Sequence, residues 1–184
     1  MSEHLITGGK AELSFLPMQS ADLDEVLKIE SVSHIHPWTK GNFSDSLAAG
    51  HWAYCIRPQV DQVIKGSYLD PDVLWAYCIL FPAVDELHLL NITVSPHLRK
   101  LGLGKRMMAA IEGVAAQQKM PRIILEVRPT NSAALALYQK LGYEQIGVRK
   151  NYYPVSPETG SREDALVMAK SIKLEPWQVR IQPS

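Results

Sequence analysis

The chain has 184 residues, a length that buries an ample hydrophobic core without disulfides or metals, so we expect one domain over residues 1–184. It carries 19 lysine or arginine and 19 aspartate or glutamate residues, a neutral balance that favours neither nucleic acid nor an acidic membrane as partner. It has no secretory signal and no run of about 18 apolar residues, so we expect a cytoplasmic protein without a membrane anchor.

The first half of the chain mixes strands and helices. A strand is predicted at 11–18, followed by a helix at 20–33 with Ser20 as its N-cap and acidic residues in its first turn. A loop containing HIHPW then leads into a short second helix. The pentapeptide WAYCI occurs at 52–56 and again at 75–79, which indicates two neighbouring strands joined by a polar, proline-bearing loop.

Each WAYCI segment contains one of the two cysteines, Cys55 and Cys78. In a reducing compartment we interpret both as small core residues rather than as a disulfide or a metal-ligand pair.

The second half alternates strands with helices. The pattern predicts, in order, a strand at 86–94, a helix at 102–119, a strand at 122–128, a helix at 131–142 that ends at Gly142, a strand at 143–149, a tyrosine-rich loop at 150–164 and a last strand at 165–172. Elements mixed in this way are typical of an α/β or α+β domain around one mixed sheet. The order of the strands does not follow from the sequence.

A glycine-containing segment, RKLGLGKRM at residues 99–107, lies between a predicted strand and a predicted helix. Gly102 and Gly104 allow close approach of the backbone to a ligand, and a helix N-terminus with four nearby cations favours a pyrophosphate. Two better-known phosphate motifs do not match, because Met107 stands where a Rossmann glycine is needed and Arg106 where a P-loop hydroxyl is needed. On this segment alone, the alternative is a tight turn with a solvated basic face.

A glutamate, Glu126, interrupts the apolar run Ile123–Val127. An unpaired carboxylate inside such a strand costs several kcal/mol. We therefore expect Glu126 either to have a partner from elsewhere in the chain or to face a cavity in which it functions.

The strand ending NITVSP, the R-x-x-G-x-G loop, the strand with an internal glutamate and the N-x-A-x-x-x-Y helix together resemble the GNAT superfamily of acetyl-CoA-dependent N-acyltransferases. The segments HPW, LEVRPTNSAALALYQKLGYEQIGVRKNYYP and GSREDALVMA are similar, more narrowly, to RimI-type enzymes, which acetylate the N-terminal alanine of a small-subunit ribosomal protein. The resemblance covers about residues 13–171, which leaves an N-terminal extension and a C-terminal tail.

This resemblance implies a GNAT-like mixed, mostly antiparallel central sheet flanked by helices, with acetyl-CoA as co-substrate. It implies that Glu126 is the general base, Tyr138 the general acid and Asn131 a coenzyme contact. It further implies main-chain contacts to the acetyl and pantetheine groups from Ile92, Thr93 and Val94, and a pyrophosphate loop formed by Lys100, Leu101, Gly102, Leu103, Gly104 and Lys105.

The chemistry of acyl transfer supports the same two side chains. A thioester is attacked by a neutral amine, yet an α-amine with a pKa near 7.7–8.0 is largely protonated at pH 7. Glu126 is the best placed candidate to accept a proton. The departing thiolate, of pKa about 8.5, needs a proton that Tyr138 could supply. On spacing alone, the pattern favours Tyr138 as a core tyrosine with its hydroxyl bonded elsewhere. Glu126 is then interpreted equally well as a paired structural carboxylate.

The sequence says less about the acceptor amine than about the catalytic residues. Neutralising a lysine side chain costs roughly 3.5 kcal/mol more than neutralising an α-amine, because their pKa values differ by about 2.5 units. This favours a protein N-terminus as acceptor, and the resemblance implies the N-terminal alanine of a small-subunit ribosomal protein. Lysine side chains, small-molecule amines and a non-catalytic acetyl-CoA-binding module are the alternatives. Neither cysteine belongs to the predicted site, which favours direct transfer over an acetyl-cysteine intermediate.

Trp38, Tyr152 and Tyr153 are the candidate walls for the acceptor, although ordinary loop packing explains them equally well. His34 and His36 lack further ligands, so no metal is expected. The N-terminal extension, a long insertion at 57–73 and the C-terminal tail depart from the RimI pattern. The oligomeric state is left open.

Overall fold

The computed structural model describes residues 4–6, 13–58, 63–64, 67–68, 73–155 and 160–174. Most of the N-terminal extension and of the 57–73 insertion, residues 156–159 of the predicted tyrosine-rich loop and the tail from residue 175 lie outside these residues. None of the helices in the described part is long and apolar enough to cross a membrane.

The helices are α1 (Leu23–Ser33), α2 (Lys40–Ala48), α3 (Leu103–Gln117) and α4 (Ser132–Lys140), with short 3-10 turns η1 (Ser20–Asp22) and η2 (Pro96–Leu98). The strands are β1 (His4–Ile6), β2 (Leu13–Pro17), β3 (Trp52–Pro58), β4 (Val63–Ile64), β5 (Ser67–Tyr68), β6 (Ala76–Pro82), β7 (Leu87–Val94), β8 (Arg122–Val127), β9 (Glu144–Val155) and β10 (Arg162–Ser171).

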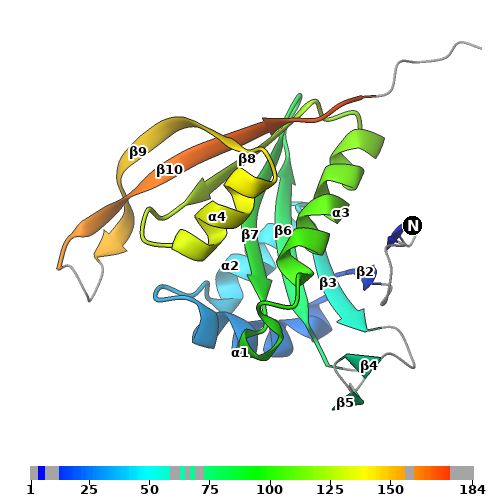
Figure 1. The fold of residues 1–184 in the computed structure, drawn as a ribbon. Coiled ribbons are helices and arrows are strands. Elements are labelled where there is room, and N and C mark those ends of the chain that lie inside the picture. The colour runs from blue at the N-terminus through cyan, green and yellow to red at the C-terminus, as the bar shows by residue number, and fades with distance from the viewer. Residues whose placement is uncertain are drawn as a thin grey trace, which may run out of the picture.

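Eight strands form one sheet in the order β1-β2-β3-β6-β7-β8-β10-β9, and β4 pairs with β5 alone (Figure 1). Within the large sheet, β7 and β8 are parallel and all other neighbours are antiparallel. The two WAYCI segments lie on adjacent strands, with Cys55 opposite Tyr77 and Tyr54 opposite Cys78. A mixed, mostly antiparallel sheet flanked by helices is therefore confirmed.

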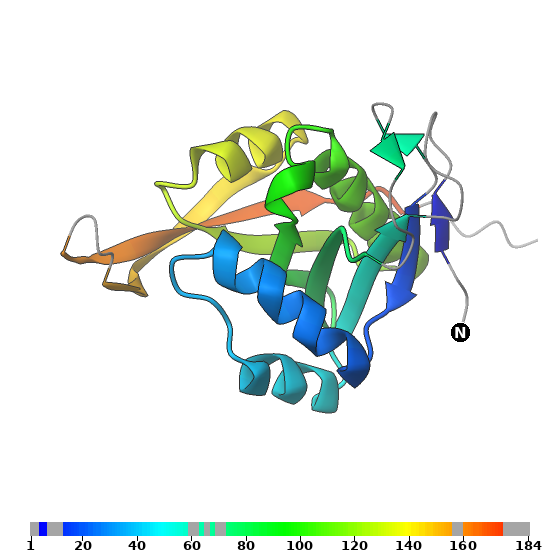
Figure 2. The ribbon, with the colours of Figure 1, turned by 90° about the horizontal axis from the view of Figure 1, so that it is seen from below.

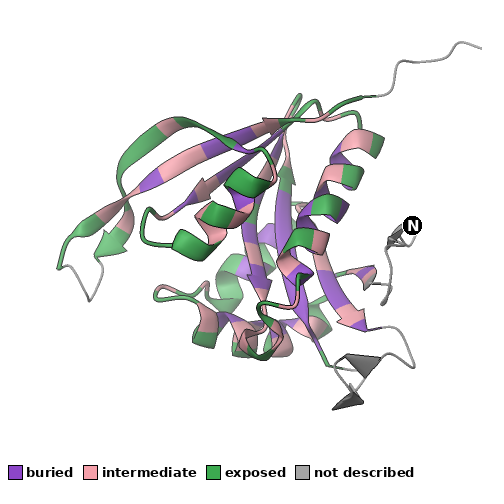
Figure 3. Ribbon diagram, in the orientation of Figure 1, coloured by how far each residue is buried: buried purple, intermediate pink, exposed green. Residues whose placement is uncertain are grey.

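Helices cover both faces of this sheet, α1 and α2 on one and α3 and α4 on the other (Figure 2). Side chains alternate between the faces along a strand, so Tyr77 and Ile79 pack with α1 and α2, whereas Cys78 and Leu80 pack with α3. β6 is accordingly buried from Ala76 to Leu80, and most residues of β3, β7 and β8 are buried or half-buried (Figure 3). This two-sided burial explains the nearly continuous apolar runs seen in the sequence.

The same alternation separates the two cysteines. Cys55 belongs to the core on the α1 and α2 side, and Cys78 to the core on the α3 side. Both are buried free thiols, and burial raises the pKa of Cys55 to about 12 and that of Cys78 further. Their interpretation as core residues is confirmed.

The parallel pair at the centre of the sheet is short. Residues Leu87–Leu89 pair with Ile123–Leu125, and the pairing stops there although both strands continue. On the other side of β7 the register with β6 shifts at this point, because Leu80 faces Leu89 while Ile79 faces Asn91. Leu90 is thus an extra residue in β7, and such bulges bend a strand. Beyond it β8 diverges from β7 (Figure 1).

Two local predictions are wrong. Ser20 does not cap α1, because the chain first makes the 3-10 turn η1 and the helix begins at Leu23. The Asp22 side chain accepts a hydrogen bond from the Gln19 N–H at 2.7 Å. The start of this helical segment is therefore stabilised by Asp22 and not by the predicted serine cap.

The predicted tyrosine-rich loop is mostly strand. β9 runs on to Val155 and β10 begins at Arg162, with register shifts along their pairing. An ion pair between Lys150 Nζ and Asp164 Oδ2, at 2.7 Å, joins the two strands. Because β9 is the edge strand, Pro154 is tolerated there without loss of a ladder hydrogen bond.

The core beneath α3 gives a stability prediction. Ile111 is fully buried, so Ile111→Ala should lower the free energy of unfolding by about 2–5 kcal/mol through lost burial and a residual cavity. Urea denaturation measures the change. The matched variant Ile146→Ala, at a side chain 55% exposed on β9, should cost less than about 1 kcal/mol. Equal losses at the two positions would contradict the described core.

Candidate active site

A cavity of about 640 Å³ opens where β7 and β8 separate. Its walls come from α1 and the loop after it (Glu30, His34, Ile35, His36, Pro37, Trp38), from β7 (His88, Leu89, Leu90, Asn91, Ile92), from β8 and the turn after it (Ile124, Leu125, Glu126, Val127, Arg128, Asn131), from α4 (Ala134, Tyr138) and from β9 (Arg149, Tyr152, Tyr153, Pro154). Segments distant in sequence thus surround one space.

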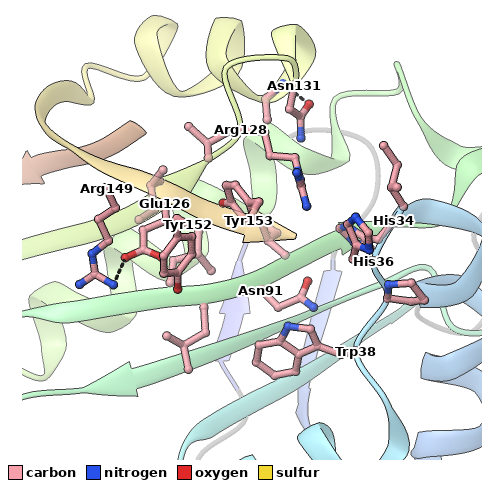
Figure 4. A pocket seen from close by; sticks show the side chains of 18 of the residues that line it. His34, His36, Trp38, Asn91, Glu126, Arg128, Asn131, Arg149, Tyr152 and Tyr153 are labelled. Atoms are coloured by element: carbon pink, nitrogen blue, oxygen red, sulfur yellow. Dashed lines mark hydrogen bonds and ion pairs between the residues drawn. The ribbon is translucent and has the colours of Figure 1, made fainter. Parts of the chain in front are cut away.

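Glu126 was expected either to have a partner from elsewhere in the chain or to face a cavity, and in the structure it does both. Its side chain is 24% exposed and lines the cavity, and its Oε1 lies 2.8 Å from Arg149 Nη1 (Figure 4). Arg149 comes from β9, and β10 lies between β8 and β9, so this ion pair reaches across a strand. Glu126 is therefore a paired carboxylate that still faces the cavity.

Tyr138 lines the same cavity from α4. Together with Ala134, one helical turn earlier, it forms the face of α4 that meets the cavity. The side chain is buried, and its ring lies 5.8 Å from that of Tyr143 in the core. Burial raises the pKa of the Tyr138 phenol to about 12, so the phenol is neutral near pH 7 and retains a proton to donate.

The three predicted acceptor-wall residues, Trp38, Tyr152 and Tyr153, also line the cavity. Glu126, Arg149 and Tyr152 lie at one side of it, and Trp38 at the other (Figure 4). Arg128 stacks over the Tyr153 ring, with 3.9 Å from its guanidinium carbon to the ring centroid. Aromatic walls around a carboxylate can accommodate a peptide terminus.

A hydrogen bond joins two of the segments that line the cavity. His36 Nε2 lies 3.1 Å from the Val155 carbonyl oxygen and so links the loop after α1 to β9. In the part of the chain that the structure describes, no group of three or more His, Cys, Asp or Glu side chains is arranged to hold a metal ion.

A second carboxylate, Glu30, is a functional candidate that the sequence interpretation missed. It is 1% exposed and lies at the cavity wall. Its Oε1 accepts from the Trp38 backbone N–H at 2.8 Å, and its Oε2 accepts from the Tyr77 hydroxyl. Asn91 Nδ2 makes longer contacts at 3.4 and 3.5 Å. These donors compensate the burial of the charge.

The signal for Glu30 was present in the sequence. Leu23 and Val26 are the buried residues of α1, and Glu30 follows at the spacing that continues their face. A charged residue at an apolar helical position is the same kind of exception that identified Glu126 in its strand. Arg128 and Arg149 carried no comparable signal.

The main chain of β7 directs N–H and C=O groups into the gap between β7 and β8. The Ser95 N–H donates to the Trp75 carbonyl at 2.8 Å, toward the β6 side, so by alternation the main-chain groups of Ile92 and Val94 point toward the β8 side. Arg99 Nε donates to the Val94 carbonyl at 3.2 Å. Of the predicted trio, only Ile92 lines the cavity, and the buried Thr93 side chain bonds to His34 and Asn91.

The glycine loop adopts the backbone that an anion site needs. Lys100 and Gly102 have φ values of 64° and 82°, and Gly102 is the N-cap of α3 without any side-chain cap. The first-turn N–H groups of α3 are thus left for a ligand. Arg106 Nη2 is buried without a hydrogen-bond partner in the described residues, and an anion would supply one. These features fit a pyrophosphate.

The loop, residues 100–105, is not part of the cavity wall. It lies beside α4, since a Cβ built on Gly104 would stand 3.3 Å from Leu137 Cδ2. Asn131 is the N-cap of α4, where its Oδ1 accepts from the Ala134 N–H at 3.2 Å, and it also lines the cavity. Helix α4 therefore connects the loop to the cavity.

Comparison with known proteins places these features in context. The model of a family described as "Acetyltransferase (GNAT) family" matches residues 23–143. A ribosomal protein bS18-alanine N-acetyltransferase of Haemophilus ducreyi is 32% identical over 80% of this chain and 92% of its own length. A putative enzyme of the same name in Bacillus subtilis is 31% identical over 86% of this chain and 95% of its own.

Solved structures agree with the sequence comparison. The crystal structure of the ribosomal-protein-S18-alanine N-acetyltransferase from Escherichia coli superposes with a TM-score of 0.74 at 27% identity, and the alignment covers 91% of this chain and 98% of that one.

The glycine loop gives a second stability prediction. Gly102→Ala should lower the free energy of unfolding by about 1–2 kcal/mol, because alanine is strained at positive φ although the space around the new Cβ is open. Gly113→Ala, within α3 and also in open space, should instead stabilise by about 0.5–1 kcal/mol. Chemical denaturation checks both signs, and stabilisation by Gly102→Ala would refute the left-handed cap.

Proposed function

Since the chain belongs to the GNAT family of acetyltransferases, which use acetyl-CoA, we propose that it acetylates the N-terminal α-amine of a protein. The N-terminal alanine of a small-subunit ribosomal protein is the proposed acceptor, in line with the names of relatives near 30% identity. The observation that carries the proposal is the single cavity that Glu126 and Tyr138 share with Trp38, Tyr152 and Tyr153.

The proposed catalytic unit is one GNAT domain with its core at about residues 13–171. Acetyl-CoA supplies a thioester, and the main chain of Ile92–Val94 would hold its acetyl and pantetheine portions in the gap between β7 and β8. Residues Lys100–Lys105 would bind the pyrophosphate through the α3 N-terminus, and Asn131 would contact the coenzyme from the α4 N-terminus.

In the proposed reaction, Glu126 takes a proton from the amine nitrogen, directly or through a water molecule, and Tyr138 protonates the departing sulfur. Tyr138, like any phenol near pH 7, holds a proton that it can donate, and burial, which raises its pKa, makes it a weaker acid than an exposed tyrosine. Direct transfer is favoured, because Cys55 and Cys78 are buried in the core and neither lines the cavity.

Two substitutions test these roles. Glu126→Gln and Tyr138→Phe should each lower kcat by about 10²–10⁴-fold, the usual contribution of a positioned acid or base, while acetyl-CoA binding is retained. Steady-state kinetics on an alanine-initiated peptide and calorimetric titration with acetyl-CoA measure the two properties.

Matched controls are available close by. Tyr143→Phe removes a hydroxyl from the neighbouring buried ring, and Glu144→Gln changes an exposed carboxylate on β9; neither residue lines the cavity. Both controls should keep activity within about threefold of the wild type, since they remove no group from the reaction. Wild-type turnover in both Glu126→Gln and Tyr138→Phe would eliminate the proposed mechanism.

Acceptor class is tested with paired peptides. Mass spectrometry should detect acetylation of peptides that begin with alanine and none on N-blocked peptides that contain lysine, because the α-amine is the easier group to neutralise. Modification confined to the blocked lysine peptides would reject the N-terminal acceptor. Tight acetyl-CoA binding without turnover of any amine would indicate a non-catalytic module.

A further inference from the structure

A buried cluster of polar side chains reaches the cavity and is not used by the proposed roles of Glu126 and Tyr138. The Tyr77 hydroxyl donates to Glu30, and His34, one helical turn after Glu30, lies beside the same carboxylate and is hydrogen-bonded to Thr93. His34 Nε2 lies 3.3 Å from Glu30 Oε2 and 2.7 Å from Thr93 Oγ1. His34 lines the cavity, with 37% of its side chain exposed.

These contacts assign the tautomer of His34. The Thr93 hydroxyl donates to Asn91 Oδ1 at 3.1 Å, so Thr93 Oγ1 is an acceptor toward the imidazole. The Glu30 carboxylate, which already accepts from the Trp38 N–H and the Tyr77 hydroxyl, is likewise an acceptor. Both neighbours thus require a hydrogen on Nε2. Nδ1 then carries the lone pair, and within the described residues it has no protein partner.

We propose that His34 accepts the first proton from the incoming α-ammonium through Nδ1, with Glu30 as the positioning residue that fixes its tautomer. This inference rests on the proposed N-terminal acetyltransferase function. A carboxylate that orients an imidazole through one nitrogen leaves the other free as a base, the arrangement that general-base histidines use.

The proton count of the reaction requires two acceptors. An α-ammonium nitrogen carries three hydrogens and the amide product one, so two protons leave as the C–N bond forms and the C–S bond breaks. His34 takes the first before attack and passes it to solvent, to which 37% of its side chain is exposed. Glu126 takes the second as the adduct collapses. The thiolate receives its proton from Tyr138, which the proton on Glu126 restores.

Burial and the charged groups around His34 together keep its imidazole in the unprotonated form. Burial lowers the pKa of the imidazole, Glu30 on α1 opposes this, and Arg99 and Arg128, from the segments after η2 and β8, lower it again. The remaining group in the cluster, Tyr77 on β6, has its own pKa raised by burial and so stays a neutral donor to Glu30. His34 is therefore neutral at pH 7.

The test is the pH dependence of kcat/KM for an alanine-initiated peptide, measured for the wild type and for His34→Gln. Glutamine is chosen because its amide can still donate to Thr93 and Glu30. At pH 7 about one α-amine in ten is neutral, so the variant should be about tenfold slower than the wild type. Near pH 9.5 the amine is already neutral, and the two rates should agree within about twofold.

His36→Gln is the matched control, because His36 also lines the cavity but its Nε2 is bonded to Val155. Its ratio to the wild type should not change with pH. A constant deficit of His34→Gln across pH, or none at pH 7, would overturn the role of His34 while leaving the proposed function intact. Absence of turnover by the wild type on this peptide would overturn both.

A second measurement does not depend on turnover. Long-range ¹H–¹⁵N spectra of the full chain at pH 7 should show the His34 imidazole neutral with its proton on Nε2. In Glu30→Gln the Nε2–H form should lose part of its population, because the carboxylate acceptor is gone. A proton on Nδ1 in the wild type would refute the assigned tautomer and with it the proposal.

Discussion

The cavity of the candidate active site exists because β7 and β8 are paired over only three residues. Parallel pairing covers Leu87–Leu89 and Ile123–Leu125, and the extra residue Leu90 then bends β7 away. Had the ladder continued, the main-chain groups of Ile92 would be used in the sheet, and the Glu126 side chain would be enclosed between packed layers. The bulge therefore leaves main-chain groups of β7 and the Glu126 carboxylate facing a cavity at the centre of a sheet that is otherwise covered by helices.

The buried Glu30 carboxylate holds the wall of the cavity that is formed by α1 and the loop after it. The loop after α1 packs its Trp38 ring beside Phe43 of the core, and the Trp38 backbone N–H is fixed to the buried Glu30 carboxylate. Glu30 in turn holds Tyr77 of the sheet and lies beside His34. Leaving such a charge without its donors costs several kcal/mol, so the network and the wall form together. The sheet at β6 and the loop after α1 are thereby positioned by one side chain.

The sequence was most informative where a residue broke a regular pattern. Glu126 in an apolar strand pointed to the cavity, and Gly102 before a basic helix start pointed to the loop. Glu30 broke a helical pattern in the same way but stood among polar neighbours, so it was not recognised. Arg149 could not be found, because its contact with Glu126 depends on the order of β8, β10 and β9. The catalytic roles themselves came from family resemblance.

The errors in the elements have a related cause. Tyrosines, Pro154 and polar residues after Arg149 are typical of a loop, but pairing with β10 keeps this segment extended through register shifts. Local propensity was overruled by a strand that follows later in the chain. The strand order was inaccessible for the same reason, since the parallel contact of β7 with β8 is a property of the assembled sheet.

The placement of the two cysteines on opposite faces of the sheet affects how turnover can be assayed. Cys55 and Cys78 cannot reach each other to oxidise, and burial keeps both as unreactive thiols rather than thiolates. Any coenzyme thiol liberated during turnover would then be the reactive sulfhydryl in solution. A colorimetric thiol reagent could follow it continuously, with little background from these two side chains.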